Sequence, residues 1–203
     1  MKRPVALFVV LSLSFLAAPR AQAAAPAATP AVVDSLALLE HAFAVDSTSF
    51  DLLFRLGVMY MDRDRVADAL RMLQMANRRR PRDMRTLVNL GAALDASGRA
   101  GEAQEYYRKA LVAAPNDSVA VCRLASSLYS QAKYPEAVNL LRDLIKSKPR
   151  SYCAYFTLGV AFADAGIYRD AIRMWQKVVE IAPSSPEATS AKESIEVLQK
   201  FIQ

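Results

Sequence analysis

From residue 50 to residue 185, apolar side chains recur at the spacing of one helix face, and the whole arrangement returns every 34 residues. In the first unit this face carries Leu53, Leu56 and Tyr60. Each unit ends close to a proline, and these prolines are Pro81, Pro115, Pro149 and Pro183. A fixed period of this length, without insertions, predicts an all-α solenoid of stacked helical hairpins.

Two further places in the period hold small residues, which would let the two helices of a hairpin approach closely. They are Gly57, Gly91, Ala125 and Gly159 at the eighth place, and Ala69, Ala103, Ala137 and Ala171 at the twentieth. Proline cannot continue a helix, so each second helix should end just before it. Candidates for the N-caps of the helices that follow are Asp83, Asn116, Asp117, Ser118, Ser151, Ser184 and Ser185.

The combined pattern resembles the tetratricopeptide repeat family, with units at 50–83, 84–117, 118–151 and 152–185. The fourth unit shows it clearly, with Leu158-Gly159, Ala171, Trp175 and Pro183 at the family's spacing. The resemblance implies antiparallel helix pairs wound into a right-handed superhelix, with about ten helices and no sheet. It also places the large aromatic side chain of Trp175 in the core.

The ends of the array need cover, because a solenoid unit cannot bury its apolar face alone. Helical spacing predicts a leading helix at 32–45 and a capping helix at 186–202, which together with the repeats form one domain at 32–203. Residues 24–31 are rich in Ala and Pro and are expected to form a flexible leader.

Residues 1–23 have the pattern of a cleavable signal peptide: a basic start, an apolar run at 5–18 and a small-x-small site ending at Ala23. The run is short for a membrane-spanning helix, which needs about 20 residues. The sequence therefore predicts export, to the periplasm if the source is bacterial. Secretion from another kind of cell and an N-terminal membrane anchor stay open as alternatives.

Cleavage would also change the charge of the protein. The signal contains Lys2, Arg3 and Arg20 and no acidic residue, so its removal leaves 23 basic and 20 acidic residues and lowers the net charge from +6 to +3. A general affinity for nucleic acid therefore does not follow from composition.

The inner surface of the family's superhelix is built from particular positions of each first helix, and the resemblance transfers these positions to this chain. The predicted partner-binding residues are Phe54, Val58, Met61, Arg85, Val88, Asn89, Cys122, Arg123, Ser126, Tyr129, Phe156 and Val160. Many are apolar, and an exposed apolar patch usually marks a binding surface. We expect a groove for an apolar helix or an extended peptide, anchored by Phe54, Tyr129 and Phe156. The alternative is that neighbouring helices cover these side chains.

One subtype of the family clamps the C-terminal carboxylate of chaperones, and only Asn89 and Arg123 match its residue set. A small carboxylate-binding spot at Arg85, Asn89 and Arg123 remains as a weaker hypothesis than solvated surface. A basic patch at Arg78, Arg79, Arg80 and Arg82, continued by Arg85, either complements a helix C-terminus or meets an acidic partner or headgroup.

Residues that could carry chemistry are few. Cys122 and Cys153 are 31 residues apart, and helix spacing favours free thiols over a strained disulfide. His41 is the one histidine in the sequence, so we expect no metal site and no cofactor. No nucleophile and base can be paired, which argues against an enzyme.

The sequence therefore predicts a non-enzymatic scaffold, adaptor or assembly factor of the bacterial envelope that binds a protein or peptide partner and no nucleic acid. A peripheral contact with the envelope and the oligomeric state stay open. The alternative function is a carrier of a small apolar ligand or lipid in the same groove, which a displaced fluorescent probe would reveal.

Overall fold

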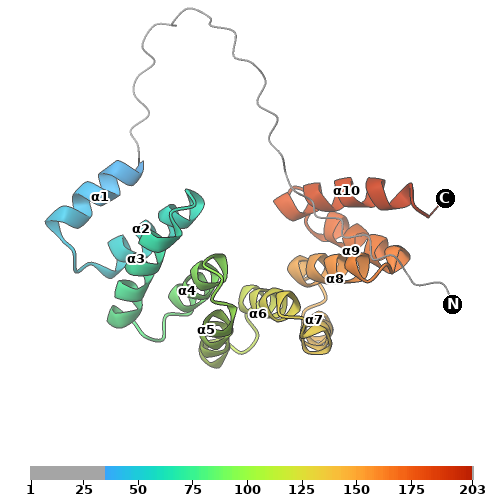
Figure 1. Ribbon diagram of the computed structural model, residues 1–203, viewed down its shortest axis with the longest axis horizontal. Coiled ribbons are helices and arrows are strands. Elements are labelled where there is room, and N and C mark those ends of the chain that lie inside the picture. Colours follow the sequence, from blue (N-terminus) through green and yellow to red (C-terminus); the bar gives the residue numbers. More distant parts are fainter. Residues whose placement is uncertain (1–34, 203) are drawn as a thin grey trace, which may run out of the picture. The chain divides into compact units, whose positions relative to one another are not determined.

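The computed structural model describes residues 35–202, which form ten α-helices and no strand (Figure 1). The helices are α1 (Ser35–Val45), α2 (Phe50–Asp62), α3 (Val66–Arg79), α4 (Met84–Ala96), α5 (Ala100–Ala113), α6 (Ser118–Ser130), α7 (Tyr134–Ser147), α8 (Tyr152–Asp164), α9 (Tyr168–Ile181) and α10 (Pro186–Gln199). The predicted all-α solenoid is confirmed. The predicted signal peptide at 1–23, the leader at 24–31 and residues 32–34 of the leading helix lie outside the described residues.

The helices from α2 to α9 pair into four hairpins that stack in chain order, with α1 before them and α10 after them (Figure 1). Each first helix (α2, α4, α6 and α8) also contacts the next first helix, and α8 contacts α10. Within residues 35–202, the backbones of the second helices (α3, α5, α7 and α9) do not pack against one another. The first helices therefore form one side of the stack, called here the inner face, and the second helices form the outer face.

Close packing inside the hairpins explains the small residues at the eighth place. A Cβ atom added to Gly159 would lie 2.3 Å from Nε1 of Trp175, and one added to Gly91 would lie 2.5 Å from Cε1 of Tyr107. Both aromatic side chains are buried, so neither has room to move aside. The prediction that Trp175 belongs to the core is confirmed.

The turns between the two helices of each hairpin share one backbone feature. The fifteenth residue of every unit has a positive φ: 58° at Asp64, 78° at Gly98, 58° at Ala132 and 74° at Gly166. Glycine adopts this conformation without strain, whereas a Cβ disfavours it. Two of the four turns therefore contain glycine, and the turn at Ala132 forms despite its side chain.

Helix caps follow the sequence in most places. The side chains of Asp83, Asp117 and Ser185 accept hydrogen bonds from backbone N–H groups in the first turns of α4, α6 and α10, as predicted. Ser49 caps α2 in the same way. Ser151 is the N-cap residue of α8, as predicted, but its side chain makes no capping hydrogen bond. Its hydroxyl lies 3.4 Å from the sulfur of Cys153 instead.

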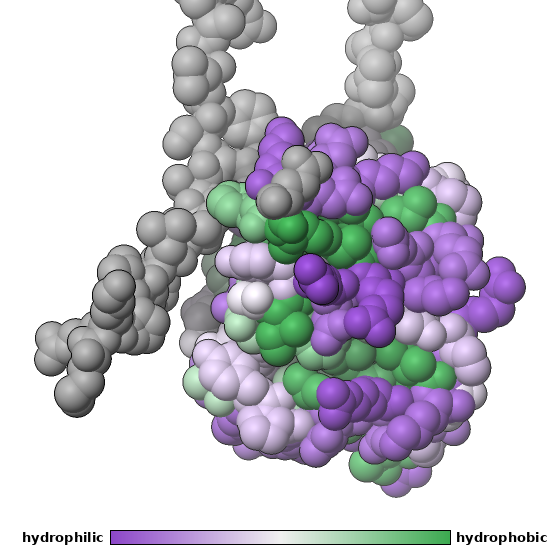
Figure 2. All heavy atoms as spheres, turned by 90° about the vertical axis from the view of Figure 1, so that its right-hand side faces the viewer, coloured by the Kyte–Doolittle hydropathy of each residue, from purple (hydrophilic) through white to green (hydrophobic). Residues whose placement is uncertain are grey.

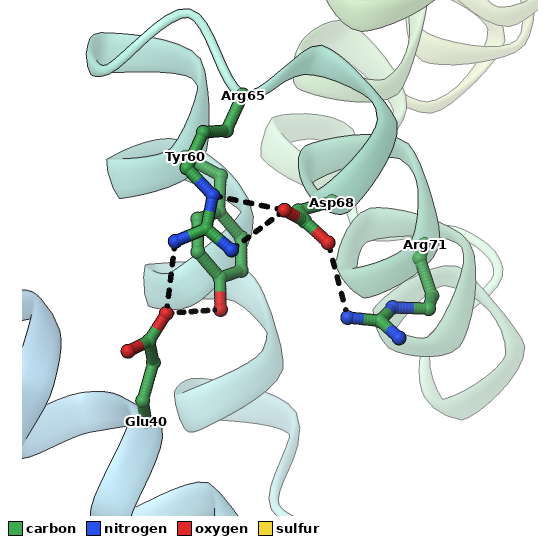
Figure 3. Close-up of polar contacts among 5 residues, drawn as sticks. All are labelled: Glu40, Tyr60, Arg65, Asp68 and Arg71. Atoms are coloured by element: carbon green, nitrogen blue, oxygen red, sulfur yellow. Dashed lines mark hydrogen bonds and ion pairs between the residues drawn. The ribbon is translucent and has the colours of Figure 1, made fainter.

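A polar cluster attaches α1 to the first repeat (Figure 3). Glu40 of α1 accepts a hydrogen bond of 2.8 Å from the hydroxyl of Tyr60 and forms an ion pair of 3.1 Å with Arg65. The guanidinium of Arg65 also pairs with Asp68 at 2.7 Å and lies over the ring of Tyr60. Asp68 binds Arg71 in turn. Burial, together with Glu40, raises the pKa of Tyr60.

Candidate partner-binding surface

The predicted partner-binding residues lie on α2, α4, α6 and α8, the helices of the inner face. Their exposure differs strongly along the stack. Arg85, Arg123 and Ser126 are exposed, and Val88 and Cys122 are buried. The remaining seven are half-buried: Phe54, Val58, Met61, Asn89, Tyr129, Phe156 and Val160. The inner face therefore presents partial surfaces of apolar side chains set between polar ones.

Two arginines cover the aromatic side chains at the N-terminal end of this face. The rings of Phe50 and Phe54 stack with their centroids 6.2 Å apart. The guanidinium of Arg80 lies 4.0 Å from the centroid of Phe50, and that of Arg85 lies 5.2 Å from the centroid of Phe54. Cation–π contacts of this kind leave the outer side of each guanidinium available to an acidic group. This end of the face thus combines apolar rings with positive charge.

The basic patch is exposed along its whole length. Arg78 and Arg79 occupy the last turn of α3, where cations complement the helix dipole, and Arg80 is its C-cap. Arg80 is additionally held by Phe50. Arg78 and Arg82 form no ion pair with any residue that the structure describes. Arg79 lies near Asp46, whose pKa is lowered mainly by hydrogen bonds from Thr48 and also by the charge of Arg79. Favourable interaction with the helix dipole thus explains the positions of Arg78 and Arg79, whereas Arg82 lies beyond the end of α3.

Tyr129 joins the third repeat to the fourth. Its hydroxyl donates a hydrogen bond of 3.1 Å to Asp164 at the end of α8, and its ring lies 4.9 Å from that of Tyr134. Burial, reinforced by the carboxylate of Asp164, raises the pKa of Tyr129 to about 12. The predicted anchor therefore has its own intramolecular contacts and offers a partner only part of its ring.

Phe156 and Val160 pack against the last hydrophobic cluster, which contains Trp175 and the buried alanines of α10. The indole N–H of Trp175 donates a hydrogen bond of 3.2 Å to the backbone carbonyl of Phe156. Neighbouring helices thus cover part of both side chains. This is the partial cover that the sequence left as an alternative.

The proposed carboxylate spot is only partly assembled. The side-chain amide of Asn89 donates a hydrogen bond of 2.8 Å to the carbonyl of Arg85, one turn earlier in α4. Arg85 itself lies over Phe54 and 3.7 Å from Asp83. Arg123 is exposed and has no ion pair with any described residue. Of the three side chains, Arg123 is therefore the one without a hydrogen bond or ion pair to a described residue.

Cys122 and Cys153 form a disulfide, so the expectation of free thiols is wrong. The expectation relied on the spacing of helix axes, but a Cα atom lies about 2.3 Å from its axis. Residues that face each other across two packed helices are therefore closer than the axes. Here the Cα atoms are 6.2 Å apart, within the usual range for a disulfide. The bond ties α6 to α8 on the inner face.

A buried polar network at the junction of the second and third repeats was not anticipated from the sequence. Asp95 accepts hydrogen bonds from the hydroxyl groups of Tyr107, at 2.8 Å, and Ser127, at 2.9 Å. Gln104 donates to the carbonyl of Ser127 and accepts from Lys133. Burial and the nearby Asp95 carboxylate raise the pKa of Tyr107. Polar residues at places that are apolar in the other units were the available signal.

Two hollows in the described surface are lined by residues outside the predicted set. The larger, about 410 Å³, lies on the outer face between α7 and α9, with α8 as its floor. The smaller, about 250 Å³, lies between α9 and α10. Figure 2 shows the C-terminal side of the molecule, where hydrophobic surface lies between hydrophilic side chains. The structure thus adds a hollow on the outer face to the inner face that the sequence singled out.

The comparisons with known proteins agree with this architecture. The model of the tetratricopeptide repeat family matches residues 54–118 and 122–186, and the chain belongs to this family. The comparison with curated protein sequences finds no match.

Solved structures of the same fold include a thermophilic TPR protein of Thermus thermophilus (16% identity, TM-score 0.69, covering 79% of this chain and 88% of that one). Another is YrrB, described as a TPR protein with an unusual peptide-binding site (23%, 0.57, 78% and 81%). A third is MamA from Desulfovibrio magneticus RS-1 (22%, 0.55, 74% and 93%). At these identities the likeness concerns the fold.

Membrane-spanning helices and clusters of metal ligands are both absent from the described part of the chain. None of the helices from α1 to α10 has the length and apolarity needed to cross a bilayer. Between residues 35 and 202, no three His, Cys, Asp or Glu side chains are grouped as metal ligands would be.

Proposed function

We propose that this protein is a non-enzymatic scaffold of the bacterial cell envelope that holds a segment of a partner protein on its inner face. The observation that carries the proposal is the set of half-buried apolar and aromatic side chains on three of the four first helices, α2, α6 and α8, from Phe54 to Val160. Partly exposed apolar groups between polar neighbours can bury further surface when a partner binds. Tetratricopeptide repeat proteins generally serve as interaction scaffolds, which supports the same conclusion.

The partner segment we propose is apolar with acidic residues at one end. Arg80 and Arg85 place positive charge beside Phe50 and Phe54 at the N-terminal end of the inner face, and the exposed Arg82 lies between them in the sequence. At the other end, Phe156 and Val160 present apolar surface. A bound segment would therefore place its acidic end at the N-terminal end of the face and its apolar residues at the other end. This difference would fix the orientation of the segment.

Export to an oxidising compartment is part of the proposal. It is supported by the signal-like residues 1–23 and, independently, by the disulfide between Cys122 and Cys153. Structural disulfides persist in the periplasm and outside the cell, whereas the cytosol keeps thiols reduced.

Photocrosslinking from the inner face tests the proposed function. A photoreactive amino acid at the exposed Ser126 should capture a partner in native envelopes, whereas the same group at the exposed Val112 of α5 should not. Phe54→Asp should reduce the Ser126 adduct at least tenfold, because it places a charge where an apolar group is buried. Val112→Asp is the matched control and should leave the adduct unchanged. Equal adducts from both positions would refute inner-face binding.

A further inference from the structure

The outer face carries the same groove twice, and the two copies differ in a way that the 34-residue period makes directly comparable. Between α5 and α7, Arg108 and Glu136 form an ion pair of 3.3 Å that joins one second helix to the next. Arg142 and Asp170 occupy the equivalent places on α7 and α9, one period later. No such pair forms there, because Asp170 is bound to Arg173 of its own helix.

The sequence explains the difference. Asn139 stands three residues after Glu136, so Glu136 has no cation at that place on its own helix. Arg173 stands three residues after Asp170 and captures it, and aspartate is one methylene shorter than glutamate. Arg142 consequently has no ion-pair partner anywhere in residues 35–202.

The floor of the groove differs as well. Val121 and Leu128, on the floor of the groove between α5 and α7, are buried. Their equivalents one period later are Tyr155 and Phe162, which are only half-buried and line the hollow of about 410 Å³. Leu158, Ile145 and Met174 complete its apolar lining. The charged residues that line it are Arg142, Lys146, Arg173 and Asp170, and Asp170 is neutralised by its ion pair with Arg173. The junction of the third and fourth repeats thus has a partly exposed aromatic floor beside Arg142, which has no ion-pair partner among the described residues.

We propose that this hollow, called here the outer site, binds a protein segment that carries a carboxylate next to an aromatic or aliphatic side chain. The apolar side chain would lie on Tyr155 and Phe162, where ring stacking adds to area burial. The carboxylate would pair with Arg142 through charge-assisted hydrogen bonds, in the place that Glu136 fills for Arg108. The bound segment would therefore complete the ion pair that α9 does not supply.

The occupant is a protein segment and not a free lipid, because the hollow is bounded by α7, α8 and α9 and remains open to solvent. Sites for whole small molecules enclose most of their ligand. The outer site is on the face opposite the inner-face residues, so it is independent of the proposed function.

The test uses a fluorescent hexapeptide with blocked ends, Gly-Asp-Phe-Leu-Asp-Gly, and fluorescence anisotropy with the purified protein. The wild-type protein should bind it, and Arg142→Gln should weaken binding about tenfold, the effect of one charge-assisted contact of about 1.4 kcal/mol. Arg108→Gln is the matched control in the bridged groove and should leave the affinity unchanged. A peptide with Asn in place of both Asp residues should bind the wild-type protein as weakly as the original peptide binds the Arg142→Gln variant.

Three results would overturn the proposal. The first is no binding of the hexapeptide at millimolar protein. The second is equal affinity of the wild-type and Arg142→Gln proteins, with circular dichroism showing both folded. The third is dodecanoate binding more tightly than the peptide in an Arg142-dependent manner, which would make the site one for a lipid.

Discussion

The junction between the second and third repeats and the junction between the third and fourth are built from equivalent helices in the same order. They are nevertheless held together by different interactions. The earlier junction has a hydrogen-bonded network around Asp95 inside and the Arg108–Glu136 pair outside. The later one has the Cys122–Cys153 disulfide on the inner face, the Tyr129–Asp164 hydrogen bond and an unbridged outer groove.

The difference shows that a repeat period sets the stacking but leaves each junction free to differ. A solenoid's stability is approximately the sum of its repeat and interface terms, so one interface can change without disturbing the others. At the later junction a covalent bond on the inner face accompanies an open groove on the outer face. That groove is consequently available to a partner.

The largest expected effect comes from removing the disulfide. Its two cysteines are 31 residues apart, and closing a loop of that length lowers the entropy of the unfolded chain by the equivalent of about 3–4 kcal/mol. Cys122→Ala with Cys153→Ala should therefore lower the free energy of unfolding by about this amount in urea denaturation. Dithiothreitol should destabilise the wild-type protein and have no effect on the double variant. Reactive thiols in a freshly prepared, unreduced native extract would contradict the disulfide itself.

Asp95 gives the next largest effect and tests the earlier junction. Asp95→Ala leaves the hydroxyl groups of Tyr107 and Ser127 without their acceptor. One hydrogen bond to a charged group contributes about 1.5–3 kcal/mol, and two bonds to the same carboxylate are not additive. We expect a loss of about 2–3 kcal/mol in the free energy of unfolding. Asp164→Ala, which removes the more exposed acceptor of Tyr129, is the matched change at the later junction and should cost less. Equal losses would mean that the two junctions do not differ as described.

The smallest effect is a pH dependence at Tyr129. Its pKa in the folded protein is about 12, above the unfolded value of about 10. The contribution of the protonated hydroxyl is therefore complete below pH 10 and is lost as the pH rises from 10 towards 12. Tyr129→Phe should lower stability by at most about 1 kcal/mol at pH 8, because the site is partly exposed. It should also flatten the alkaline decline in thermal stability. Tyr152→Phe, at an exposed tyrosine on α8, is the control and should not.

Most of the fold could be predicted from the sequence, because hairpin packing depends on local spacing. Gly159 had to be small to admit Trp175, and Pro183 had to follow the end of a helix, so a 34-residue pattern of such residues specifies stacked hairpins. The caps at Asp83 and Asp117 follow for the same local reason. Ser151 takes the predicted N-cap position of α8, but the sequence did not show that its hydroxyl would lie beside the sulfur of Cys153 and make no capping bond.

The inner-face residues could be placed on their helices, but their exposure could not be predicted. Val88 is buried and Phe54 half-buried, although both occupy the fifth place of their units, because exposure depends on the neighbours that the next repeat supplies.

By itself, the sequence determined the fold class, the number of hairpins and the side of the stack to which each residue belongs. These follow from periodicity, which is a property of contacts within one or two helices. The tertiary structure decided that Cys122 meets Cys153, that Glu136 reaches Arg108 and that Arg142 is left unpaired. Each of these depends on distances of a few ångströms between side chains of different repeats. Periodicity carries no information at that scale.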